Sequence, residues 1–375
     1  MITNRSPRYT PINWLVVGGE ASLAAGYVGD MSRPCRLSSN RAIILYDYGT
    51  SLYGYCVYTA TGYAITVGPQ CLVSYGPFTG HNWGENHFCS VRLTDTKAVA
   101  LWMTSSGLMS SVLNVSTNTI TPATSQTITT SANGPLDAIA ISDTRFLVLL
   151  RTSAGDFQVL LCNVAGNVIT LVTSLSGLLL NNVSLQCDIY NVSAGRYIIT
   201  TESSMNSFYR TFQLFDVSGN TLTAVGSVLT VSTGSSLSIT GCEKTTQLVT
   251  ENRLVYLSGQ SSVYYNNISI SGTTIAEDPS KNVIMSVPGY NLSDPRRYLS
   301  MLDTGWFIYS NFSQIFLTKF SNPNSQSKIT SISFGSTPSS STPMSCVLNS
   351  NLILLFFNQV ISGQANLLVK GIIRN

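Results

Sequence analysis

Short apolar runs separated by polar turns recur along the whole chain. The clearest copy lies between Arg41 and Gly68, where AIILY and the alternating run YCVYT are followed by a tight ATG turn and a last run, ITV. Runs of this length, rich in β-branched and aromatic residues and bounded by Gly, Ser and Asp, are typical of adjacent antiparallel strands. Helix signals are nearly absent, and no apolar run approaches the ~18 residues of a membrane helix. The pattern predicts an all-β chain that does not insert into a membrane.

Two markers repeat with one period of about 52 residues. The first is the residue that opens each strongly apolar run, and five of the seven copies are basic: Arg41, Lys97, Arg145, Arg196, Arg253, Gly305 and Asn351. The second is a turn followed by an aliphatic residue, as in TATGYAIT, NVSTNTIT, NVAGNVIT and DVSGNTLT, with weaker later copies. Its apolar positions are Ile65, Ile120, Ile169, Leu222, Ile275 and Ile329. Gly and Asn at these tips are expected to supply the positive φ of tight hairpins.

Each repeat divides into four strands; in the third copy we expect them at 137–141, 145–151, 157–164 and 168–173. Four antiparallel strands repeated at this spacing indicate a β-propeller, in which neighbouring sheets bury each other's faces. The sequence predicts a single seven-bladed propeller domain over residues 1–375. The predicted blades are 33–76, 87–133, 137–182, 186–236, 242–287, 294–336 and 343–375. The last blade has three strands of its own, so residues 11–18 are expected to complete it and close the ring.

Composition narrows the possible partners. Charged residues make up 10% of the chain and the net charge is +3, against roughly 25% charged residues in an average soluble protein. With no basic run, nucleic acid is not an expected partner. The first residues lack the apolar segment of a signal peptide, which predicts synthesis and assembly in a cytoplasm.

Eight cysteines are spread along the chain without CxxC spacing, so neither a structural zinc site nor a dense disulfide framework is expected. We interpret them as small buried side chains. Five fall near the first strand of a blade, where a crowded channel favours small residues: Cys35, Cys89, Cys187, Cys242 and Cys346. A redox or metal ring in the channel is the alternative.

Catalytic motifs are absent from the sequence: HExxH, GxSxG, a P-loop and a GxGxxG after a strand do not occur. We therefore expect no catalytic residue, no cofactor and no metal site. The cluster GPFTGHNWGENHF, at 76–88, lies between the first two blades, and connections of this kind carry function on propellers. Its His81, Trp83 and His87 are candidate contacts to a partner or glycan, because an indole offers a flat face to a sugar. Packing on the rim and metal ligation by His81, Glu85 and His87 are the alternatives.

A second candidate contact is SDPRRY, at 293–298, where Arg296 and Arg297 precede an inner strand. An arginine pair can hold a carboxylate or phosphate through paired hydrogen bonds. The alternative is surface solvation, or pairing with Asp294 or Asp303.

The repeat pattern LSSNRAIILY followed by TATGYAITVG resembles repeats of bacteriophage tail-associated and other virion propeller proteins. The resemblance covers the blades from Ser38 onward. It implies a non-enzymatic virion structural protein, assembled in the host cytoplasm, such as a tail knob, decoration or connector. Its expected partners are other virion proteins and a host surface receptor or glycan. The alternatives are a lectin-like module that binds glycans through loops such as 76–88, and a glycan-cleaving enzyme, which would need convergent carboxylates on one face of the ring.

Overall fold

The computed structural model describes most of the chain, and the statements below concern only this part. It comprises residues 14–16, 21–25, 31–48, 50–60, 64–75, 87–178, 184–203, 209–232, 246–250, 253–258, 262–278, 282–286, 299–301, 306–310, 314–322, 325–333, 344–349, 352–361 and 364–374. Every regular element in these ranges is a β-strand. Accordingly, none of the described segments is a helix long and apolar enough to cross a membrane.

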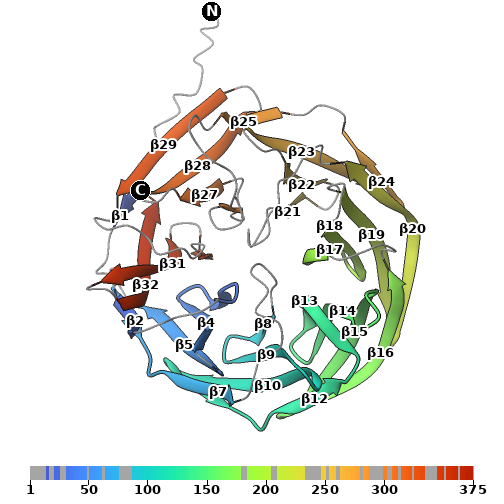
Figure 1. The fold of residues 1–375 in the computed structure, drawn as a ribbon, viewed down its shortest axis with the longest axis horizontal. Helices are drawn as coiled ribbons and strands as arrows, with labels where there is room; N and C mark the ends of the chain where they lie inside the picture. Colours follow the sequence, from blue (N-terminus) through green and yellow to red (C-terminus); the bar gives the residue numbers. More distant parts are fainter. Residues whose placement is uncertain are drawn as a thin grey trace, which may run out of the picture.

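The described strands form seven antiparallel sheets arranged around a central axis, which gives the molecule its propeller-like form (Figure 1). The first sheet holds β3 (Cys35–Ser38), β4 (Arg41–Tyr48), β5 (Ser51–Thr59), β6 (Ile65–Val67) and β7 (Cys71–Tyr75), and the second holds β8 (Phe88–Thr94), β9 (Lys97–Thr104), β10 (Gly107–Ser116), β11 (Thr119–Pro122) and β12 (Gln126–Thr129). The third holds β13 (Ala132–Ser142), β14 (Arg145–Thr152), β15 (Phe157–Ala165) and β16 (Val168–Leu178), and the fourth holds β17 (Ser184–Ser193), β18 (Arg196–Ser203), β19 (Tyr209–Ser218) and β20 (Thr221–Ser232).

The remaining sheets follow the same order. The fifth holds β21 (Thr246–Thr250), β22 (Arg253–Ser258), β23 (Ser262–Ser271), β24 (Thr274–Glu277) and β25 (Asn282–Ser286), and the sixth holds β26 (Leu299–Met301), β27 (Trp306–Ser310), β28 (Gln314–Asn322) and β29 (Ser325–Ser333). The seventh joins both ends of the chain: β30 (Met344–Asn349), β31 (Leu352–Ile361) and β32 (Gln364–Arg374) pair in order, and β1 (Trp14–Val16) and β2 (Ala21–Ala25) both pair with β32.

The outermost strand of every sheet changes register opposite the middle of its neighbour. In four sheets it is split in two, as in β6 and β7, which both pair with β5. In the other three it stays continuous and carries a bulge, as between the pairs Phe212↔Leu229 and Leu214↔Val225 of β19 and β20. A bulge bends a strand and increases its twist, so the outer edge of each sheet is kinked at the same level.

Apolar side chains fill the spaces between neighbouring sheets. The core between the first and last sheets includes Ile44, Tyr46, Leu354 and Phe356, and similar clusters lie between sheets one and two, two and three, three and four, and four and five. The second strand of a sheet is covered on both faces, which is why β4 is buried continuously from Ala42 to Asp47. These runs therefore read as unbroken apolar stretches rather than as alternating ones.

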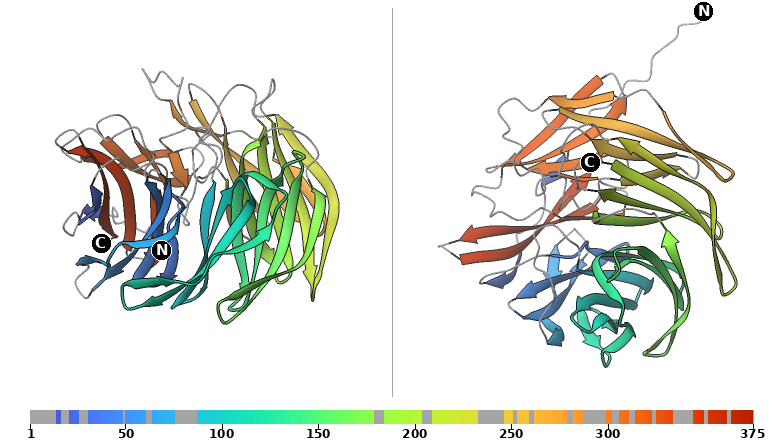
Figure 2. Two further views of the ribbon diagram at one scale, coloured as in Figure 1. Left: turned by 60° about the horizontal axis from the view of Figure 1, so that its bottom comes forward. Right: turned by 45° about the vertical axis from the view of Figure 1, so that its right-hand side comes forward.

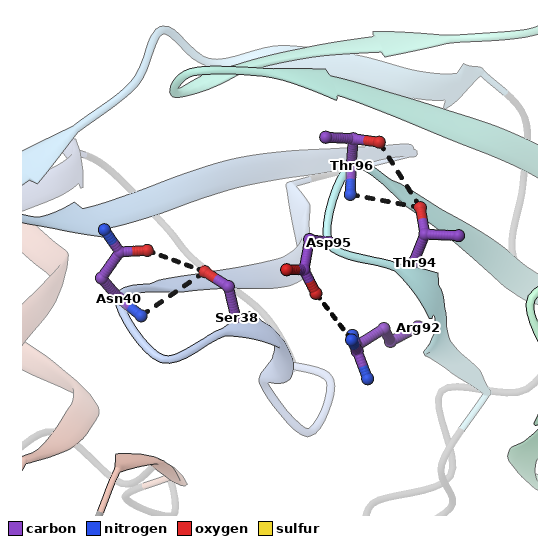
Figure 3. A network of polar contacts seen from close by, with 6 residues as sticks. All are labelled: Ser38, Asn40, Arg92, Thr94, Asp95 and Thr96. Atoms are coloured by element: carbon purple, nitrogen blue, oxygen red, sulfur yellow. Dashed lines mark hydrogen bonds and ion pairs between the residues drawn. The ribbon is translucent and has the colours of Figure 1, made fainter.

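The polar turns before the first three basic markers, Arg41, Lys97 and Arg145, are each held by a hydroxyl within the turn. Ser38, Thr94 and Ser142 each accept a hydrogen bond from the backbone N–H two residues further on, at 3.4, 3.2 and 3.3 Å. Figure 3 shows the first two of these turns, together with an ion pair between Arg92 and Asp95 at 2.6 Å. Ser and Thr favour such turns because the side chain replaces a backbone acceptor.

The basic marker itself joins its sheet to the next one. Four side chains donate to a backbone carbonyl at the tip of the next sheet's outer hairpin: Arg41 to Thr117 (3.4 Å), Lys97 to Gly166 (3.2 Å), Arg145 to Gly219 (2.6 Å) and Arg196 to Gly272 (2.8 Å). We call these four hydrogen bonds the latches. Both repeat markers are thus two sides of one contact, which explains why they run in phase along the sequence.

The hairpin tips have the geometry that the latches need. Their first residues, Thr117, Gly166, Gly219 and Gly272, have φ between 53° and 62°, as expected of a two-residue type II′ turn. The next residue also contacts the preceding sheet: a Cβ on Gly68 would lie 1.7 Å from the carbonyl oxygen of Asn118, and one on Gly226 would lie 1.9 Å from that of Thr273. The asparagines expected to share the positive φ do not adopt it; Asn220 instead accepts a hydrogen bond from Arg145.

Candidate functional site

Most of the surface residues predicted as contacts lie outside the described residues. This applies to His81, Trp83, Arg296 and Arg297, and their binding roles stay predictions. His87 is described: it directly precedes β8, is 8% exposed, and its carbonyl accepts a hydrogen bond from the Met103 N–H at 2.8 Å. Its side chain is therefore enclosed by protein in this structure.

The structure brings together a charged cluster that was not predicted. Arg33, just before β3, contacts the carboxylates of Asp137 on β13 (3.4 Å) and Asp188 on β17. β3, β13 and β17 are edge strands of the first, third and fourth sheets, and Figure 1 shows β13 and β17 beside the central axis. The guanidinium thus ties the first sheet to two sheets that are not its neighbours in the chain. We call this cluster the central tie.

The central tie is largely removed from water. The Asp188 side chain is only 3% exposed and the Asp137 side chain 14%. Burial raises the pKa of Asp137 to about 6; Arg33 opposes the rise, Asp188 adds to it, and hydrogen bonds from the Ile189 and Ala138 backbones oppose it. Among the described residues the two carboxylates share the Arg33 guanidinium, and ionising both of them in a poorly solvated place is unfavourable.

The cluster has a sequence signal that could have revealed it. Arg33, Cys89, Asp137 and Asp188 each stand eight residues before a basic marker, respectively Arg41, Lys97, Arg145 and Arg196. The ladder registers agree, because Cys89, Asp137 and Asp188 lie opposite the fifth residue of their second strands, Leu101, Leu149 and Thr200. In the other three repeats this place is taken by Thr245, Arg297 and Pro343. Four of the seven residues at this repeat position are charged, although charged residues make up only 10% of the chain. Charge is therefore enriched at this position.

The carboxylate pair has the chemistry of a structural tie. Glycan cleavage by two carboxylates needs one acid and one base or nucleophile on either side of a bound sugar. Here Arg33 contacts both carboxylates at once, and Asp137 also accepts the Ile189 N–H at 3.0 Å. The arrangement gives no positive indication of an enzyme.

The cysteines near the axis are buried and reduced. Cys35, Cys89, Cys187 and Cys346 lie on the first strands β3, β8, β17 and β30, while Cys242 lies outside the described residues. Burial raises the pKa of Cys35 to about 12 and that of Cys56 to about 11. Such thiols stay protonated and are poor nucleophiles. Within the described ranges, no group of three or more His, Cys, Asp and Glu side chains could hold a metal ion.

A second unpredicted feature is a stack of tyrosines on one face of the first sheet. Tyr55 stacks on Tyr46 with ring centroids 5.6 Å apart, Tyr46 stacks on Tyr53 at 5.8 Å, and Tyr53 meets Tyr48 edge-on at 6.4 Å. Tyr46 is fully buried and its hydroxyl accepts a hydrogen bond from Gln70, whereas Tyr48 is 44% exposed. The stack therefore runs from the core between the first and last sheets out to solvent.

Comparison with known proteins shows the fold class alone. No protein-family model matches the chain, and no curated protein does. Among solved structures, the BP39L lectin from Burkholderia pseudomallei superposes with a TM-score of 0.58 at 10% identity, covering 91% of this chain and 96% of the lectin. A protein described as a hypothetical selenium-binding protein from Sulfolobus tokodaii gives 0.53 at 8% identity, covering 90% and 84%. The chain thus has a propeller-like all-β fold, and these identities carry no information about what it binds.

Proposed function

We propose that the protein is a non-enzymatic virion structural protein that presents one end of its propeller to other virion proteins and to a host surface receptor. The observation that carries this proposal is the use of the charged residues. In the described ranges, the repeated basic residues hold neighbouring sheets together and Asp137, Asp188 and Asp216 pair with arginines. These charged side chains stabilise a rigid scaffold, which suits a docking role better than catalysis.

The setting in a virion rests on the resemblance of the repeats, and its test is the composition of the particle. Virions purified from the native host would contain the chain at a fixed ratio to the major structural proteins by quantitative mass spectrometry. Immunogold labelling would place it at one site, on the tail, head or connector. A chain that is abundant in the infected cell and missing from purified particles would overturn the proposal.

We further propose that the seven sheets are the blades of one closed ring, completed by the N-terminal strands. Three observations support it: β1 pairs with β32, the core between the first and last sheets is continuous, and Asn349 of β30 donates a hydrogen bond to the Ser39 carbonyl at 2.9 Å. A ring closed by pairing the two ends of the chain should depend on the short strand that closes it.

Deletion of residues 1–18 removes β1 and tests this closure. We expect the melting temperature to fall by roughly 5–10 °C, because the edge of β32 that pairs with β1 loses its partner. Deletion of residues 1–13, which keeps β1, is the matched control and should change it little. Superimposable melting curves for the deletion of 1–18 and the full chain would contradict ring closure.

A lectin-like role is the second candidate, and a specific observation favours it. Tyr48 and Tyr75 are exposed at the same end of the first sheet, and phenol rings are common contacts for ligands with both apolar and hydroxyl-bearing faces. This candidate is compatible with the virion proposal, since a docking protein can recognise a surface glycan.

A further inference from the structure

The two exposed tyrosines belong to one row across three strands. Tyr48 at the end of β4 lies opposite Ser51 of β5, and Ser51 lies opposite Tyr75 of β7. Residues directly opposite in a sheet project from the same face, so both rings stand on the same face with a small serine between them. Two strand spacings separate the tyrosine Cα atoms by roughly 10 Å.

The ring of Tyr48 is held in place by the stack behind it. It meets Tyr53 at an interplanar angle of 72°, and Tyr53 in turn stacks on the buried Tyr46. Tyr75, in contrast, is 78% exposed. One side of the row is therefore preorganised, which lowers the entropy cost of binding.

The surroundings of the row are polar and uncharged. Thr50 is exposed beside it, and Ser74 donates to the Tyr75 carbonyl. Asp47, the one charged side chain on the neighbouring described residues of β4, β5 and β7 at this end, is 4% exposed. Flat aromatic faces flanked by hydroxyl groups match a neutral sugar ring, which has apolar C–H faces and hydroxyl edges.

We propose that the row of Tyr48, Ser51 and Tyr75 is a binding subsite for one neutral sugar residue of a surface polysaccharide. The sugar ring lies with its C–H faces against the exposed phenols of Tyr48 and Tyr75, on either side of the buried Ser51, and its hydroxyls exchange hydrogen bonds with the tyrosine hydroxyls. This inference rests on the proposed function in its glycan-binding form. It assigns that binding to residues on the first sheet, independently of Trp83.

Affinity electrophoresis of the full chain in native gels tests the inference. The gels contain dextran, yeast mannan or galactan as neutral polymers, or polygalacturonate as an acidic one. We expect at least one neutral polymer to retard the protein, and Tyr75→Ala and Tyr48→Ala each to weaken apparent binding about five- to tenfold, the effect of losing one aromatic contact. Tyr75→Phe should keep most of the binding.

Tyr209→Ala is the matched control, because Tyr209 is 41% exposed and lies on β19 of the fourth sheet. It should bind as the unaltered chain does, and the melting temperatures of all variants should agree. Equal retardation of Tyr75→Ala and the unaltered chain would overturn the inference, as would retardation by polygalacturonate alone. Loss of Tyr75→Ala from assembled particles without any polysaccharide binding would make the row a protein contact and also overturn it.

The two proposals can fail separately. A chain present in virions that no neutral polymer retards keeps the virion role and loses this subsite. A chain retarded by a neutral polymer through Tyr48 and Tyr75 but missing from virions keeps the subsite and loses the virion role.

Discussion

The two ends of the sheets are built differently. At the end that carries the β3–β4 and β5–β6 turns and their equivalents, the latches repeat from sheet to sheet with the same residue types. At the other end, where β4 turns into β5, the first sheet exposes Tyr48 and Tyr75. The central tie lies between the two ends, midway along the inner strands, and among the described residues it joins the first, third and fourth sheets. Figure 2 shows the strands running between these two ends.

The difference separates what holds the fold from what is available for recognition. A hydrogen bond that recurs between successive sheets fixes the orientation of each sheet relative to the next one, which every sheet requires. A feature that occurs in one sheet, such as the exposed tyrosines, is not required for this packing of sheets. The latch end is thus the structural end, and the opposite end carries the exposed tyrosines that we propose as a binding surface.

The largest expected effect is at the latch end, at the glycine in the bulge of β20. Gly226→Ala places a Cβ 1.9 Å from the Thr273 carbonyl oxygen, and its φ of 68° is unfavourable for alanine. The backbone of one sheet must move, so we expect a loss of about 3–5 kcal/mol in the free energy of unfolding. Urea unfolding followed by circular dichroism measures it.

Gly219→Ala separates the two causes. Gly219 has a similar φ of 56°, and a Cβ there would meet nothing within 4 Å. Gly219→Ala should lower the free energy of unfolding by only about 1 kcal/mol, because it adds backbone strain alone. If both variants lost the same stability, close packing of the hairpin tip on the preceding sheet would not be what Gly226 provides.

The sequence predicted the latch end well because its signals are local. In the third repeat, expected strands at 145–151 and 157–164 compare with Arg145–Thr152 and Phe157–Ala165 in the structure. Each turn is determined by one or two residues, such as Ser142 or Gly166, so the pattern can be read from a few positions. The last strand of that repeat is longer than expected, reaching Leu178 rather than 173, because a bulge lets it continue past the register change.

The central tie and the tyrosines of the opposite end could not be predicted in the same way. The contact of Arg33 with Asp137 spans 104 residues and two sheets that are not adjacent, and its residue types differ from repeat to repeat. The row of tyrosines also depends on the register between β5 and β7, which shifts at a bulge between Leu52 and Tyr53. Only pairing in three dimensions brings Tyr75 opposite Ser51.

The second prediction concerns the pH dependence of the central tie. The folded-state pKa of Asp137 is raised to about 6 from an ordinary value of 3.8. The folded state therefore binds more protons than the unfolded state between these values, so this group's contribution to stability falls as the pH rises from about 4 to 6 and is constant above. The free energy of unfolding of Asp137→Asn should therefore rise relative to that of the unaltered chain over this window, by about 3 kcal/mol.

Thermal unfolding of both proteins between pH 4 and pH 7 measures the difference, and subtraction removes the contributions of other carboxylates. Asp216 acts in the opposite sense and at lower pH, because its hydrogen bond with Arg196 lowers its pKa below the ordinary value of 3.8. Its contribution to stability is lost only as the pH falls below about 4, so Asp216→Asn should run parallel to the unaltered chain between pH 4 and pH 7 and serves as the control. Parallel profiles for Asp137→Asn and the unaltered chain would mean that Asp137 does not titrate in the tie.

The smallest expected effect is the loss of a single latch. Arg145 donates to Asn163 on its own sheet at 3.0 Å and to Gly219 and Asn220 on the next sheet at 2.6 and 3.1 Å. Arg145→Met keeps the aliphatic stem and removes these donors, which should cost about 1 kcal/mol because the contacts are charged but partly solvated. Arg92→Met is the matched control, since Arg92 pairs with Asp95 inside a single turn and is half exposed; it should cost less than about 0.5 kcal/mol. Equal midpoints for the two variants in urea would mean that the basic marker is retained for something other than joining sheets, and the contrast between the two ends of the molecule would lose its physical basis.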